Sequence, residues 1–125
     1  MEIIARMFLS PSENSAGSRI LICLFVWLLL VLMAGLMWST PIELFLSYCV
    51  LSFYLLHRFR SKSSLIYFSI GILLGPLGEV ITVSLGAWSY SNTDFLFPVW
   101  LPLAWGIAAI CLKQLGEAIE ELMAD

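Results

Sequence analysis

Four long apolar stretches constrain this chain more than any other feature of its sequence. They cover residues 19–38, 41–59, 63–87 and 98–115. About 20 apolar residues in a helix cross the hydrocarbon core of a bilayer, and a helix satisfies its backbone hydrogen bonds internally. The composition is 61% hydrophobic and 12% charged, whereas a soluble domain is near half apolar and a quarter charged. The sequence therefore predicts an all-α membrane protein with four transmembrane helices.

The segments that flank these stretches are short, so we expect a single four-helix domain. Residues 1–18 combine an amphipathic stretch that suits the membrane interface with a polar linker. Residues 114–125 are predicted to form an acidic cytoplasmic tail, although Leu115, Ile119 and Leu122 recur at helical spacing and also suit a continuing helix. The net charge of −3 gives no indication of a nucleic-acid partner.

All basic residues fall on one side of the predicted bundle. They are Arg6, Arg19, Arg58, Arg60, Lys62 and Lys113. Because lysine and arginine accumulate in cytoplasmic connections, this distribution places both termini in the cytoplasm. We expect an integral membrane protein of the inner (cytoplasmic) membrane of a bacterium.

Glu79 is the one acid well inside a predicted membrane helix. Burying a carboxylate in a bilayer costs roughly 2.5–3.5 kcal/mol on insertion scales, so such residues face protein or a polar cavity. Since every basic residue lies at or beyond a cytoplasmic helix end, we expect desolvation to keep Glu79 neutral at pH 7. Two interpretations stay open: a neutral acid that ties helices together, or a functional centre that binds a ligand or donates a proton.

Small side chains share the helical face of Glu79. The residues three, four, seven and eight positions away are Thr82, Gly75, Gly86 and Gly71. Small residues let two helices approach closely in a membrane, so this face is predicted to pack against another helix or a partner. Pro76 lacks an amide hydrogen, and it predicts a kink in the same helix.

Aromatic side chains crowd the connection that follows this helix and the start of the next one. The candidate ligand-binding residues among them are Trp88, Tyr90, Trp100 and Trp105. An aromatic belt at the headgroup level explains them, and so does a lid over a lipid-facing pocket at Glu79. Glu43 lies in the first turn of the second predicted helix, where the helix dipole favours an anion, and it is a second candidate catalytic acid.

The cysteines and the single histidine form no metal or cofactor motif. Cys23, Cys49 and Cys111 each lie within a predicted membrane helix, and no two are in CxxC spacing. His57 lies beside Arg58 and Arg60 at a helix end, away from any cysteine. We therefore expect no metal, no cofactor and no disulfide framework.

Two short patterns resemble membrane proteins of carotenoid biosynthesis. The stretches Gly75–Glu79, Gly86–Tyr90 and Pro98–Trp105 are similar to the carotenoid hydratase family. Pro41–Glu43 is similar to an element of the small heterodimeric lycopene cyclases, with Leu44 in place of their second acid. The resemblance implies that a buried acid protonates a carbon–carbon double bond and that aromatic rings stabilise the resulting cation.

Three functions compete on this evidence. The first is a module that binds a lipid-phase ligand (isoprenoid, carotenoid or lipid) near Glu79, and the second is an accessory subunit or homo-oligomer that packs with partner helices. The third is a hydratase-like or cyclase-like membrane enzyme, or half of one, with Glu79 as general acid. The small size and the absence of cofactor motifs favour the non-catalytic functions.

Overall fold

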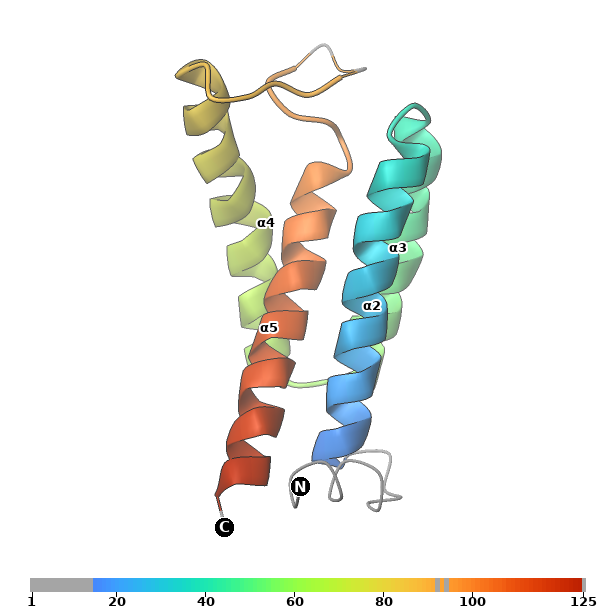
Figure 1. Cartoon of the computed structure of the whole chain (residues 1–125), viewed down its shortest axis with the longest axis vertical. Coiled ribbons are helices and arrows are strands. Elements are labelled where there is room, and N and C mark those ends of the chain that lie inside the picture. Colours follow the sequence, from blue (N-terminus) through green and yellow to red (C-terminus); the bar gives the residue numbers. More distant parts are fainter. Residues whose placement is uncertain (1–14, 92, 94, 125) are drawn as a thin grey trace.

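The computed structural model describes residues 15–91, 93 and 95–124 of the chain. Within them, the structure consists of helices with no strand. The helices are α2 (Ala16–Met37), α3 (Pro41–Arg58), α4 (Lys62–Ser84) and α5 (Leu101–Met123). The predicted all-α class is confirmed. In Figure 1, the start of α2, the α3–α4 connection and the end of α5 lie at the lower end, and the other two connections lie at the upper end.

Two of these helices are long and apolar enough to cross a membrane, namely α2 and α4. The other two are less apolar over their length. Glu43 and Arg58 fall within α3, and the second half of α5 includes Lys113 and three glutamates. Two helices of the structure, α2 and α4, therefore support the prediction of a membrane protein.

Local sequence signals explain where the helices begin. The Oγ of Ser15 accepts a hydrogen bond from the amide of Ser18 at 3.1 Å, and the Oγ of Ser61 accepts one from the amide of Ser64 at 3.0 Å. These serines cap α2 and α4 by satisfying amides that have no partner within the helix. Proline occupies the first turn of α3 and of α5, where its missing donor costs little.

The predicted helix starts at 19 and 98 each lie three residues from the observed starts, Ala16 and Leu101, and two predicted helix ends also differ from the structure. The helix predicted for residues 63–87 ends at Ser84, and Gly86 has a φ of +85°. Because glycine adopts this left-handed conformation without strain, Gly86 turns the chain away from the helix axis. Gly86 is therefore exposed beyond α4, which corrects its predicted place on the packing face.

The last helix is longer than the predicted segment 98–115, since α5 continues to Met123. Its final turns pack against the start of α2, where Ala118 and Leu122 bury Ala16 and Ile20. An ion pair of 2.9 Å between Arg19 and Glu121 joins the same two helices. Residues 114–123 thus belong to the bundle and do not form a separate tail.

The core lies among α2, α3 and α5, with α5 in contact with all three other helices. Its buried members are Cys23, Val26, Leu30, Leu44, Tyr48, Leu55, Phe59, Ile107, Ile110 and Cys111. Tyr48 is fully buried, and its hydroxyl donates a hydrogen bond of 2.6 Å to the backbone oxygen of Leu30. This bond satisfies a polar group in the core and fixes α3 against α2.

Helix α4 lies at the edge of the bundle and packs mainly on α5. Its large apolar side chains are mostly exposed, as shown by Leu73 at 69%, Leu74 at 62% and Leu77 at 56%. Apolar exposure on this scale suits contact with lipid or with another apolar surface. What holds α4 in place is therefore its contact with α5, the most extensive between any two helices of the described bundle.

Candidate functional site

Gly71 and Gly75 bring α4 into close contact with α5. A Cβ atom at Gly71 would lie 2.5 Å from the backbone oxygen of Trp105 and 2.9 Å from the Cβ of Ala109. A Cβ atom at Gly75 would overlap the indole of Trp105 and lie 2.6 Å from its Cβ. The two glycines therefore have no room for a side chain, as the predicted packing of this face requires. The partner is α5 of the same chain.

The contact is reciprocal, because α5 also presents a glycine to α4. A Cβ atom at Gly106 would lie 2.7 Å from the ring of Phe68 and 3.0 Å from the side chain of Ile72. Each helix thus receives a large side chain of the other in a gap left by glycine. Close approach of this kind is how membrane helices gain van der Waals contact without a hydrophobic driving force.

An open cleft of about 520 Å³ runs along the outside of this helix pair. It is lined by Tyr67, Ile70, Gly71, Leu74, Gly75, Gly78, Glu79, Thr82, Trp88, Trp105 and Ala109. From Tyr67 to Thr82 the lining follows α4 for about 22 Å, at 1.5 Å per residue. Three glycines of α4 line it, and so do the indole rings of Trp88 and Trp105, of which Trp105 contacts Glu79. The cleft is therefore long, and most of its lining is apolar.

The carboxylate of Glu79 is the polar end of the cleft. The hydroxyl of Tyr90 donates a hydrogen bond to its Oε2, and the indole N–H of Trp105 donates one of 3.3 Å to its Oε1. Thr82 does not join this network, because its hydroxyl bonds the carbonyls of Gly78 and Glu79 within α4. Glu79 is half-buried, so its carboxylate still reaches the cleft.

The remaining predicted aromatics surround Tyr90. Trp88 lines the same cleft. The ring of Trp100 meets the Tyr90 ring edge-on at a centroid distance of 6.3 Å, and it meets the Tyr48 ring edge-on at 6.1 Å. Burial raises the pKa of Tyr90, and the neighbouring Glu79 raises it further. The phenol therefore stays protonated and available as a donor. Of the predicted ligand-binding residues, Tyr90 and Trp105 thus contact Glu79, Trp88 lines the same cleft, and Trp100 contacts Tyr90 but is not part of the cleft lining.

Glu79 lies nearer to the end of its helix than the sequence indicated. Because α4 ends at Ser84, Glu79 is about 7.5 Å from the helix end, at 1.5 Å per residue. The expectation of a neutral Glu79 rests on a position well inside the membrane helix and on the lack of a cationic partner. The structure supplies two neutral donors to it, Tyr90 and Trp105, and the neutral state stays a prediction. The Tyr90 hydroxyl can donate or accept, so the pair stays hydrogen-bonded whichever residue carries the proton.

Glu43 does not belong to this site. Its side chain is exposed in the first turn of α3, next to the buried Leu44. It is absent from the lining of the Glu79 cleft, which is formed by α4, α5 and the connection between them. The helix dipole therefore explains Glu43, and its assignment as a second catalytic acid finds no support in the geometry.

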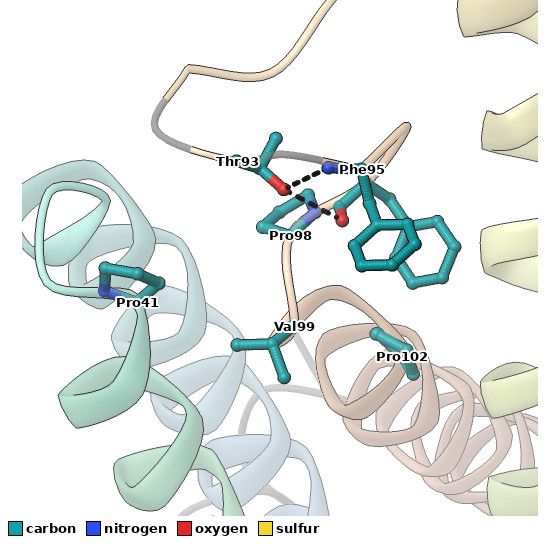
Figure 2. Close-up of a pocket in the computed structure, with 7 residues that line it drawn as sticks. Pro41, Thr93, Phe95, Pro98, Val99 and Pro102 are labelled. Carbon is teal, nitrogen blue, oxygen red and sulfur yellow. Dashed lines mark hydrogen bonds between the residues drawn. The ribbon is translucent and has the colours of Figure 1, made fainter.

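A second cavity, of about 780 Å³, was not predicted from the sequence. It lies between the start of α3 and the connection that leads into α5, and its lining includes Pro41, Thr93, Phe95, Val99 and Pro102 (Figure 2). The Thr93 hydroxyl accepts from the amide of Phe95 and donates to the carbonyl of Phe97, both at 3.2 Å. Among the described residues, the lining contains no acidic, basic or cysteine side chain.

No family model, no curated protein and no solved structure matches the chain. The choice of the Glu79 cleft as the candidate site therefore rests on its geometry alone. The resemblance to carotenoid-biosynthesis proteins stays a prediction. Within residues 15–124, the positions that the structure describes contain no group of three His, Cys, Asp or Glu side chains placed to hold a metal ion.

Proposed function

We propose that all four helices cross the membrane, with both termini in the cytoplasm of a bacterial cell. The span-length helices α2 and α4 support this, since α3 and α5 lie alongside them in one bundle. Arg19, Arg58, Arg60 and Lys62 lie near the end shared by the start of α2 and the α3–α4 connection. The positive-inside rule assigns that end to the cytoplasm.

Accessibility labelling of single introduced cysteines tests this topology. In intact cells, a membrane-impermeant maleimide is expected to label Ser89→Cys, in the connection after α4, and to leave Ser61→Cys unlabelled until the cells are opened. The unmodified chain is the control, because its native cysteines lie within the helices. Labelling of Ser61→Cys but not Ser89→Cys in intact cells would reverse the orientation.

We propose further that the chain binds a lipid-phase ligand in the Glu79 cleft. The observation that carries this proposal is the convergence of Glu79, Tyr90 and Trp105 at one end of a long apolar cleft that opens sideways. Ligand sites combine an apolar lining with a few convergent polar groups in this way. An isoprenoid, a carotenoid or another lipid with one polar end group has the matching shape and polarity.

Native mass spectrometry of the protein released in mild detergent tests this binding. We expect one small molecule to remain with each chain, and we expect Glu79→Leu to lose it because the polar end of the cleft is gone. Glu43→Leu is the matched control, since it removes an acid outside the cleft and is expected to keep the bound molecule. A spectrum without any bound molecule in the unmodified protein would contradict the proposal.

The alternative function is an enzyme that protonates an isoprenoid double bond, with Glu79 as general acid. The Tyr90–Glu79 hydrogen bond beside an apolar, indole-lined cleft favours it, because such a pair can hold a transferable proton next to a polyene. Formation of a hydrated or cyclised product from a bound isoprenoid, abolished by Glu79→Gln, would establish this alternative over simple binding.

A role as an accessory subunit or homo-oligomer stays a prediction. The glycine face that motivated it is occupied within the chain, because α5 covers Gly71 and Gly75. A partner helix would therefore dock elsewhere, and the exposed leucines of α4 are the available apolar surface.

A further inference from the structure

We infer that the ligand of the Glu79 cleft is a single-chain lipid whose polar end is a primary ammonium group, an inference that rests on the proposed binding function. The first argument is charge. Glu79 receives its hydrogen bonds from Tyr90 and Trp105, which are both neutral donors. The described residues that line the cleft include no lysine or arginine. A carboxylate with neutral neighbours in an apolar surrounding is complementary to a cation.

The second argument is the hydrogen-bonding capacity left on Glu79. A carboxylate offers about four lone-pair sites, two on each oxygen. Tyr90 occupies one site on Oε2, and Trp105 occupies one on Oε1, so each oxygen keeps an acceptor site. A primary ammonium group carries three N–H donors and can bridge both oxygens, whereas an alcohol carries one donor.

The third argument is the aromatic border of the cleft. Trp88 and Trp105 both line it, and their side chains are 49% and 39% exposed. An ammonium group is attracted to the face of an indole ring, and tryptophan is the strongest aromatic partner for it. The rings and the carboxylate therefore favour the same end group.

The apolar part of the cleft determines the rest of the ligand. Between Glu79 and Tyr67 the lining consists of glycine, alanine, leucine and isoleucine with the indole of Trp105, over a length of about 18 Å at 1.5 Å per residue. This length accommodates a long hydrocarbon or isoprenoid chain. The described lining contains no lysine or arginine, and Lys113, whose Nζ lies 6.0 Å from the centroid of the Tyr67 ring, is paired with Glu117. Since a phosphate would have no lysine or arginine of the lining to bind, the geometry points to a long-chain amine and not to a phospholipid.

A matched pair of probes tests the inference. Oleylamine and oleyl alcohol have the same chain and differ only in the end group. When each is titrated against the protein in nanodiscs and bound probe is counted by native mass spectrometry, we expect the amine to bind about tenfold more tightly, as a charged hydrogen bond predicts. Glu79→Gln is expected to abolish this preference, and Glu43→Gln, at an exposed acid outside the cleft, to preserve it.

The outcomes separate the inference from the proposed function. Equal binding of both probes, with both displaced from the cleft by Gly78→Phe, would overturn the ammonium inference and leave lipid binding standing. Absence of binding by either probe and of any co-purified molecule would overturn both. As an independent arm, Trp88→Leu is expected to weaken amine binding, whereas Trp27→Leu, an exposed indole on α2, is expected to leave it unchanged. An equal effect of the two tryptophan variants would contradict the assignment of Trp88.

Discussion

Gly75→Leu is expected to separate α4 from α5 and to lower the free energy of unfolding by about 3 kcal/mol, the upper end of the range for an overpacked contact. The reason is that a Cβ at this position already overlaps the indole of Trp105, so a leucine must displace either the ring or the helix. Displacing the ring also removes its hydrogen bond to Glu79. Reversible unfolding in mixed detergent micelles, followed by tryptophan fluorescence, measures the change.

Gly78→Leu is the matched control for this prediction. It makes the same substitution on the same helix, but a Cβ at Gly78 meets nothing within 4 Å. We expect its stability to stay within about 0.5 kcal/mol of the unmodified protein, as for surface substitutions. If the two variants unfold alike, the glycine-mediated contact between α4 and α5 is not what holds α4 in the bundle.

Tyr48→Ala is expected to destabilise the protein by about 3–5 kcal/mol, as deletion of a large buried aromatic does. Tyr48 is fully buried, donates to the backbone oxygen of Leu30, and meets Trp100 edge-on. Because Trp100 in turn contacts Tyr90, loss of Tyr48 is also expected to loosen the aromatic border of the site. Ligand retention should therefore fall even at temperatures where the variant is still folded.

Tyr54→Ala provides the comparison on the same helix. Tyr54 is 46% exposed, so its removal leaves the core intact and is expected to cost less than about 1 kcal/mol. The same micelle unfolding assay applies to both variants. A Tyr54→Ala variant as unstable as Tyr48→Ala would show that the side of α3 that carries Tyr54, and not only the side that carries Tyr48, packs in the core.

Helical spacing was sufficient to predict much of the candidate site. Glu79, Gly75 and Gly71 share a face in any regular helix, so their common exposure to one neighbour follows from sequence alone. Tyr90 was predictable as a neighbour because a short connection after α4 keeps it near the helix end. The aromatic character of Trp105 makes it a candidate, but its contact with Gly75 depends on the rotation of α5 about its own axis, which the sequence does not determine.

The parts that were not predicted depend on tertiary packing. Gly86 shares the period of the glycine face, yet it ends the helix because a left-handed residue there lets Ala87 return a hydrogen bond to Thr82. The extension of α5 relies on Ala118 and Leu122 meeting α2, a contact between segments far apart in the chain. Glu43 resembled a catalytic acid by motif alone, and the placement of α3 leaves it outside the cleft.

The claim that the cleft holds a ligand is tested most directly by filling it. Gly78 lines the cleft and has open space at its Cβ position, so Gly78→Phe places a ring where the ligand chain would lie without disturbing α5. Gly35→Phe on α2, also with nothing within 4 Å of its Cβ, is the matched control outside the cleft. Native mass spectra of the two folded variants are compared for the co-purified molecule and for added oleylamine. We predict that Gly78→Phe retains neither and that Gly35→Phe retains both; retention by Gly78→Phe at the level of Gly35→Phe would contradict the account.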